Sequence, residues 1–337
     1  MQRVPLITFF GLIVLILGLG FALDRRPISA PAPTVSSSIA RGLNFIAAAH
    51  TPYHFVDPYL EYVYSGEKLE CGLPGCRATY RTLDAYFALT MIKPRLTQSE
   101  TRAVSEVLAE SDSVLADMVT RWRAKPIYNT LTSTEADTEG IALDTYCILG
   151  TLTDDATMAQ QAVKYLTPDG NWIADDNHKN DTWRNIADET WCLRLLARTN
   201  TAPERLAPMI QKKVEETRAY LDSTEPANFK LAVLYHMLIL MKDLTGPNYS
   251  SLIKEYQNSS AELFQSGVAD NDPLALGNLL EALVETKYVH VAILRDVSQK
   301  LIGLQEADGA WRAQGDYPVF ASLRSLAGLT AYQEAQR

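Results

Sequence analysis

Residues 231–241 of this 337-residue chain read LAVLYHMLILM. Wound at 3.6 residues per turn, this run is apolar on nearly every side, so it would expose apolar surface to water wherever it were uncovered. Two further runs, 142–152 and 320–329, are similarly apolar except for one charged residue in each. Helices of this kind must be covered all round, and the three runs therefore predict an inner layer of helices.

Amphipathic segments alternate with these apolar runs. Residues 98–123, 205–221 and 252–264 combine charged and apolar residues at helical spacing, which is the pattern of helices that cover a core from outside. The strict alternation that marks strands is almost absent. The sequence therefore predicts an all-α protein with an outer and an inner layer.

The inner helices recur at a regular interval. We place their starts near Arg77, Asp137, Thr182, Asn228, Asp272 and Pro318. After the first, the starts follow one another about every 45 residues, which indicates a repeat of helix pairs. Two geometries satisfy such a repeat, an open solenoid and a ring closed on itself. Because the long connections all precede inner helices and so share one face, where a site would be built, we predict the closed form. It is an (α/α)6 toroid of six helix pairs in which the last inner helix packs against the first.

The amino-terminal end predicts a membrane anchor ahead of the folded body. Residues 4–23 contain no charged side chain and are long enough to span a bilayer as a helix. We interpret residues 1–26 as an uncleaved transmembrane anchor, with a cleaved signal segment as the alternative. Residues 27–38, rich in Pro, Ser and Ala, predict a linker, and residues 39–337 the toroid domain. The body is expected outside the cytoplasm.

Composition and net charge limit the classes of partner that the protein is expected to bind. The formal net charge is −9, with 47% hydrophobic and 21% charged residues, a balance typical of a globular protein. An acidic body repels phosphate backbones, so nucleic acid is not an expected partner. Cys71 and Cys76 flank a Pro-Gly turn pair, and both a disulfide and two free thiols remain open for them.

Acidic residues recur at one position of the repeat. In repeat register Asp84 aligns with Asp144 and with Glu189, each inside a helix whose burial makes an unpaired carboxylate unfavourable. We therefore predict that the three acids converge on a wet central cavity as candidate catalytic groups. Two of them would act as general acid and base on a glycosidic bond. The alternatives are a binding cavity without turnover, and ion pairs with neighbouring arginines that only orient the helices.

Aromatic and further acidic residues complete the predicted site. Flat rings near the acids would stack on sugars, and other acids would line the rim or cap helices. The candidate substrate-binding residues are Tyr86, Tyr146, Trp183, Trp191, Asp57, Asp137 and Asp188. Cys147, Cys192 and His236 also share one level of the repeat. These residue types suit zinc, but we favour core packing and predict no metal and no cofactor.

A short motif carries a family resemblance. Residues 305–311 read QEADGAW, which resembles the QW repeat of the terpenoid cyclase and protein prenyltransferase superfamily. The resemblance implies an α/α toroid fold from about residue 36 onward. The Asp-x-Asp-Asp acid motif of squalene-hopene-type cyclases is absent from the chain.

Three function classes follow. The main expectation is a membrane-anchored toroid that binds or processes a cell-envelope carbohydrate and, if it is an enzyme, is a glycan hydrolase or lyase. The alternatives are a terpenoid cyclase-like or prenyltransferase-like protein and a non-catalytic binding or scaffold toroid. Polar walls with paired acids would favour sugars, whereas an apolar aromatic pocket with one acid cluster would favour isoprenoids.

Overall fold

The computed structural model describes the chain at residues 33–55, 68–70, 73–74, 77–125, 127–128, 141–166, 172, 182–244, 249–313 and 318–337. The chain divides into two compact units, Met1–Thr34 and Val35–Arg337. Every described helix and strand lies in the second unit.

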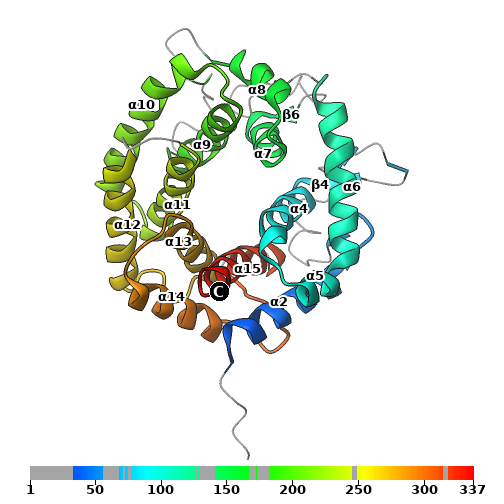
Figure 1. Ribbon diagram of the computed structural model, residues 1–337, viewed down its shortest axis with the longest axis vertical. Coiled ribbons are helices and arrows are strands. Elements are labelled where there is room, and N and C mark those ends of the chain that lie inside the picture. The colour runs from blue at the N-terminus through cyan, green and yellow to red at the C-terminus, as the bar shows by residue number, and fades with distance from the viewer. Residues whose placement is uncertain are drawn as a thin grey trace, which may run out of the picture. The chain divides into compact units, whose positions relative to one another are not determined.

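Helices of an outer and an inner set alternate along the second unit (Figure 1). The outer set comprises α2 (Val35–Ala49), α6 (Ser105–Trp122) with the short α5 (Gln98–Ala103) before it, α8 (Ala156–Val163), α10 (Pro203–Leu221), α12 (Ser250–Gln265) and α14 (Val291–Gly303). The inner set comprises α4 (Tyr80–Ile92), α7 (Leu143–Thr153), α9 (Thr182–Thr199), α11 (Ala227–Asp243), α13 (Pro273–Glu285) and α15 (Pro318–Ala335). The described part of the second unit is thus mostly helical, as predicted.

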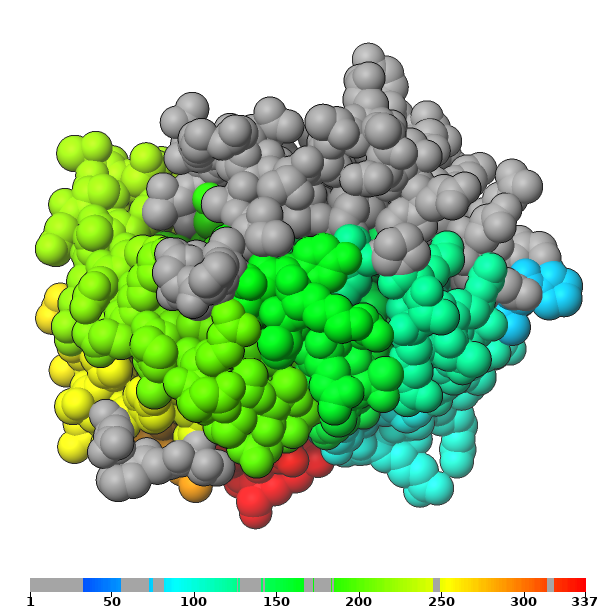
Figure 2. Space-filling view, turned by 90° about the horizontal axis from the view of Figure 1, so that it is seen from above, coloured from blue at the N-terminus to red at the C-terminus, as the bar shows by residue number. Residues whose placement is uncertain are grey.

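The inner helices form a closed ring. Each packs against the next in chain order, and the last, α15, packs against the first, α4. In the space-filling view of Figure 2, the outer segments likewise follow one another in chain order, from α6 through α8 to α10. The contact between α15 and α4 is the one that an open solenoid lacks, so the prediction of a closed ring is confirmed.

The apolar run that opened the sequence argument is buried as expected. Within 231–241 only Ala232 and His236 are more than slightly exposed. Each large apolar side chain buried in this way contributes about 1.5–3 kcal/mol relative to an exposed one. Helix α11 is therefore held on both sides, by α9 and α13 in the ring and by α12 outside it.

Two glycines bring α13 and α15 unusually close together. A Cβ atom built on Gly277 would lie 2.5 Å from the carbonyl oxygen of Arg324, and one built on Gly328 would lie 2.6 Å from the carbonyl oxygen of Gly277. Only glycine permits this approach of the two backbones. The close crossing places Arg324 of α15 directly beside α13.

The segment 305–311 fastens the last helix pair to the first helix. The Gln305 side chain donates to the Ser38 carbonyl at 2.9 Å, and the Trp311 indole, fully buried, donates to the Leu301 carbonyl at 2.7 Å. Gly309 has a positive φ of 91°, and its Cα approaches the Arg41 backbone too closely for a side chain. These contacts give the segment a structural role in closing the ring.

Short strands lie in the connections that lead into inner helices. The pair β1 (His50–Thr51) and β2 (His54–Phe55) and the pair β3 (Lys68–Glu70) and β4 (Arg77–Thr79) are antiparallel, whereas β5 (Ile127–Tyr128) and β6 (Ile141–Ala142) are parallel. A single 3₁₀ turn, η1 (Lys93–Arg95), follows α4.

The predicted anchor lies outside the described residues, as do residues 27–32 of the predicted linker. Helix α2 begins at Val35, so residues 35–38, predicted as linker, belong instead to the first outer helix. Among the described residues, no helix combines the length and the apolar character that crossing a membrane requires.

Candidate functional site

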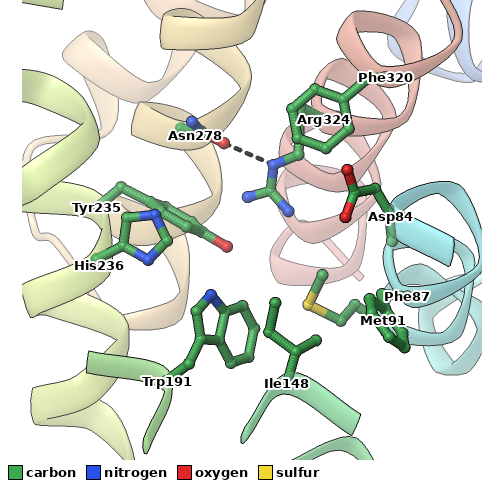
Figure 3. Close-up of a pocket in the computed structure, with 11 residues that line it drawn as sticks. Asp84, Phe87, Met91, Ile148, Trp191, Tyr235, His236, Asn278, Phe320 and Arg324 are labelled. Carbon is green, nitrogen blue, oxygen red and sulfur yellow. Dashed lines mark hydrogen bonds between the residues drawn. The ribbon is translucent and has the colours of Figure 1, made fainter. Parts of the chain in front are cut away.

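A central cavity of about 130 Å³ lies inside the ring, and all six inner helices contribute to its wall (Figure 3). Its lining residues are Asp84, Phe87, Ala88 and Met91 of α4, Ile148 of α7, Trp191 of α9, Tyr235 and His236 of α11, Asn278 of α13, and Phe320 and Arg324 of α15. On α4 these residues are spaced three and four apart, which places them on one helical face. Most of the wall is apolar or aromatic.

Arg324 is the cation of this wall, and its position is set by α13. Its Nε donates to Asn278 Oδ1 at 2.6 Å and its Nη2 to Glu281 Oε2 at 2.6 Å. The guanidinium carbon lies 4.6 Å from the ring centroid of Tyr235, so the cation rests on an aromatic face. The side chain is nevertheless almost wholly buried, with a relative exposure of 6%.

Glu281 joins Arg324 to a larger ion cluster. Arg95 Nη1 donates to Glu281 Oε1 at 2.9 Å and Arg95 Nη2 to Glu285 Oε1 at 2.7 Å, and Lys242 pairs with Glu285 as well. Although desolvation acts in the opposite direction, the guanidinium groups of Arg324 and Arg95 lower the pKa of Glu281 to about 2. We call these five residues the Glu281 cluster; it holds three cations and two carboxylates.

His236 faces the cavity as a neutral imidazole. Desolvation, reinforced by the charges of Arg324 and Arg194, lowers the pKa of His236 to about 3. The ring meets those of Trp191 and Tyr235 edge-on, and it has no hydrogen-bond partner among the described residues. Its nitrogens are therefore available to a ligand, one as donor and one as acceptor.

The three predicted catalytic acids do not all converge on the cavity. Asp84 lines it. Asp144 lies one helical turn before Ile148 and so on the same face of α7, but it is not among the lining residues. Burial raises the pKa of the Asp144 carboxyl, against the opposing effect of hydrogen bonds from Thr145.

The placement of Glu189 at the cavity is wrong. Its carboxylate forms an ion pair with Lys213 of the outer helix α10, whose Nζ also lies 2.5 Å from Glu216. Glu189 precedes the cavity residue Trp191 by two positions, which is about 200° around a helix, so it must face the outer layer. Asp188, three positions before Trp191, shares the inner face of α9.

The predicted aromatic residues likewise divide between the cavity wall and positions away from it. Trp191 lines the cavity. Tyr86, two positions after Asp84, is turned outward and its hydroxyl donates to Glu110 of α6. Tyr146 is fully buried and lies outside the cavity wall, and this burial, reinforced by the charge of Asp155, raises the pKa of its phenol. Trp183 stacks on Phe229 with centroids 5.1 Å apart, also away from the wall.

Two predicted residues, Asp57 and Asp137, lie outside the described residues. Sequence reasoning missed Arg324 and Asn278, and it assigned His236 to core packing, with zinc binding as the alternative, rather than to a ligand site. A signal for Arg324 was present, because it is the one charged residue of the apolar run 320–329. An isolated charge in a helix that must be buried indicates either a buried partner or a ligand.

The prediction that Cys147 and Cys192 lie at one level of the repeat is confirmed, and the two residues are bonded to each other. Cys147 of α7 and Cys192 of α9 form a disulfide with Cα atoms 4.8 Å apart. Their sequence separation of 45 matches the predicted repeat interval. Both residues are buried, as the favoured core-packing interpretation predicted, and the bond between their sulfurs excludes the zinc alternative for them. No cluster of three potential metal ligands occurs among the described residues, and Cys71 and Cys76 lie outside them.

Comparison with known proteins gives a likeness of fold. No protein-family model matches the chain, and no curated protein matches its sequence. The structure is similar to the type II terpene cyclase MstE from Scytonema in its apo form, with a TM-score of 0.53 and 14% identity, over 90% of this chain and 99% of that one. A substituted form of MstE in complex with its substrate, geranylgeranyl dihydroxybenzoate, matches with a TM-score of 0.51 and 14% identity, over 90% of this chain and 97% of that one. The fold is terpenoid cyclase-like.

Proposed function

We propose that this protein binds an isoprenoid-type ligand in its central cavity and acts on it as a terpenoid cyclase-like enzyme, with Asp84 as the acid. The observation that carries the proposal is the lining of the cavity. Its wall is built mainly from aromatic and aliphatic side chains, and Asp84 is its one carboxyl group among the described residues. Apolar walls with few polar groups suit a hydrocarbon ligand.

The same wall argues against glycan cleavage. Glycosidases of the common retaining and inverting types place two carboxyl groups on either side of the scissile bond. Here Glu189, which sequence register offered as a second acid, is occupied by Lys213 of the outer layer. The described cavity therefore favours the isoprenoid alternative over the carbohydrate expectation.

The proposed chemistry is protonation of a carbon–carbon double bond. Asp84, in its carboxylic acid form, transfers its proton to one alkene carbon, and positive charge develops on the neighbouring carbon. Trp191 and Tyr235 each hold a guanidinium group over one ring face, Arg194 and Arg324 respectively, so in this proposal the substrate cation is stabilised by the ring quadrupole of their opposite faces. An apolar wall also excludes water, which would otherwise capture the cation.

The size of the cavity limits what enters it. Engineered cavities of about 150 Å³ take up benzene, and the cavity here, about 130 Å³, is close to that size. It therefore accommodates roughly one isoprene unit or one aromatic ring. A longer ligand would place one end in the cavity.

We further propose that the body lies outside the cytoplasm, held by residues 4–23. The disulfide between Cys147 and Cys192 supports this location, because such bonds persist mainly in oxidising compartments. Protease treatment of intact cells tests the proposal: cleavage of the body without lysis is expected, and protection until lysis would contradict it.

The enzymatic proposal is tested by incubating the purified protein with prenyl substrates of increasing chain length and analysing the products by mass spectrometry. Asp84→Asn should reduce turnover at least tenfold, because the amide cannot supply the proton. Asp296→Asn, which makes the same change on the exposed surface of α14, is the matched control. Unchanged turnover in Asp84→Asn, or binding of oligosaccharides but not of prenyl compounds, would contradict the proposal.

A further inference from the structure

The guanidinium of Arg324 has donor capacity left on the cavity side. It donates through Nε to Asn278 and through Nη2 to Glu281, and Tyr235 is a third hydrogen-bond partner, which leaves two of its five N–H donors. Figure 3 shows the terminal nitrogens directed into the space between Tyr235 and Asp84. The guanidinium therefore has N–H groups left for a ligand on the cavity side, and a guanidinium is well suited to carboxylate oxygens.

The Glu281 cluster carries one positive charge in excess. Arg324, Arg95 and Lys242 are cations, whereas only Glu281 and Glu285 are carboxylates. The buried members balance one another, two guanidinium groups against two carboxylates, and the third cation, Lys242, is 43% exposed. What Arg324 offers an anionic ligand is therefore a guanidinium with remaining N–H donors at a poorly screened site, not an uncompensated charge.

His236 offers a second hydrogen-bond donor to an anionic group in the cavity. It lines the cavity on α11 beside Tyr235, and it is uncharged at neutral pH with its hydrogen-bonding nitrogens unused by the described residues. A neutral imidazole donates one hydrogen bond through its N–H. An oxygen acceptor at this end of the cavity would therefore meet donors from two inner helices, α11 and α15.

We infer that Arg324 and His236 form a binding subsite for a carboxylate, so that the ligand is an acid bearing an apolar unsaturated or aromatic body. The inference rests on the proposed binding of an apolar ligand in the central cavity, and it adds the head group. The carboxylate accepts hydrogen bonds from the Arg324 guanidinium and from the His236 N–H, while the apolar part packs on Trp191 and Phe320.

Titration of tryptophan fluorescence tests the inference, since Trp191 is part of the wall. The probes are two matched series, geranic acid, geraniol and geranylamine, and benzoate, benzyl alcohol and benzylamine. We expect the acid of each series to bind at least tenfold more tightly than the amine, with the alcohol between them.

Substitutions in the subsite test whether its residues cause the preference for the acid over the amine. Arg324→Gln should reduce the difference between acid and amine to less than twofold, while Arg218→Gln, an exposed arginine paired with Glu255, should leave it unchanged. Should Arg324→Gln fail to fold, His236→Phe provides a second variant, in which the acid loses affinity and the alcohol does not. The order of affinities for the acid, the alcohol and the amine is measured on the unaltered protein and so needs no variant.

The outcomes separate the inference from the proposed function. Geranyl probes that bind without any head-group preference, or an amine that binds most tightly, would overturn the inference and leave the proposed function standing. Binding of benzoate with no binding of geranyl compounds would overturn the isoprenoid proposal and support the carboxylate subsite. Absence of binding in both series would overturn both.

Discussion

At the scale of single residues, Glu281 is the carboxylate on which the polar side of the cavity depends. It accepts hydrogen bonds from Arg95, Arg324 and Tyr235 while it is itself buried. Replacing it by glutamine leaves two buried guanidinium groups without their shared counter-charge. Glu281→Gln should therefore lower the free energy of unfolding by about 3–5 kcal/mol, measured by urea denaturation. Glu255→Gln, at the exposed ion pair with Arg218, should lower it by no more than about 1 kcal/mol.

The same residue predicts a dependence of stability on pH. The pKa of Glu281 falls from its ordinary 4.5 to about 2 on folding. Because the folded value is the lower one, its contribution to stability is fully present above about pH 4.5 and is lost as the pH falls toward 2. Urea denaturation between these limits should show a steeper loss of stability in the unaltered protein than in Glu281→Gln. Equal slopes would show that Glu281 does not titrate in this way.

Asp84 and Glu189 are predicted to differ although they share a register position. Glu189→Gln removes one partner of the buried Lys213, which retains Glu216, and should cost about 1–3 kcal/mol of stability without changing ligand affinity. Asp84→Asn should change ligand binding or turnover. Thermal melting and ligand titration of both variants would check this. A loss of ligand binding in Glu189→Gln at intact stability would contradict the outward orientation of that side chain.

At the scale of elements, the disulfide between Cys147 and Cys192 ties α7 to α9. It closes a loop of about 45 residues, for which typical stabilisation is about 2–4 kcal/mol. The double variant Cys147→Ser/Cys192→Ser should lose stability in this range, measured by chemical denaturation without reductant. Reductant should lower the stability of the unaltered protein more than that of the double variant. An equal loss in both proteins would show that the effect of reductant does not come from this disulfide.

The close crossing of α13 and α15 gives a second prediction at this scale. Gly277→Ala would press a Cβ atom against the Arg324 carbonyl oxygen, so the helices must separate, at a loss of about 1–3 kcal/mol. Gly303→Ala on α14 is the control, because nothing lies within 4 Å of its added Cβ, and it should be neutral or stabilising by up to about 1 kcal/mol. Thermal melting distinguishes the two; equal effects would mean that the crossing tolerates a methyl group.

At the scale of the whole folded unit, closure of the ring predicts how the chain tolerates rearrangement. Gln333 near the end of α15 donates to Ser36 of α2 at 3.0 Å, so the two ends of this unit are adjacent. A circular permutant with new termini at the exposed Val289 should fold with an unchanged circular dichroism spectrum.

Deletion of residues 314–337 provides the contrasting case. It removes α15 and with it the contacts to α4, α13 and α2, so cooperative unfolding should be lost. A truncated protein that still melts cooperatively would indicate the independent repeats of a solenoid rather than a closed ring.

The sequence by itself determined the helix pairs and their order. Apolar runs without a polar face can only be inner helices, and their interval of about 45 residues sets the number of pairs. The same interval brought Cys147 and Cys192 to one level, where they are bonded. These features are readable because periodicity and chain connectivity are local properties of the sequence.

Only the tertiary structure decided the rotation of each inner helix about its own axis. Two positions along a helix turn a side chain by about 200°, so residues aligned by repeat register share a level but need not share a face. Glu189 thus faces Lys213, while Trp191 faces the cavity. Closure was likewise decided by packing, through the contact of α15 with α4. The place of Arg324 in the cavity wall depends on its bonds to Asn278 and Glu281 of a neighbouring helix, which no pattern within its own helix specifies.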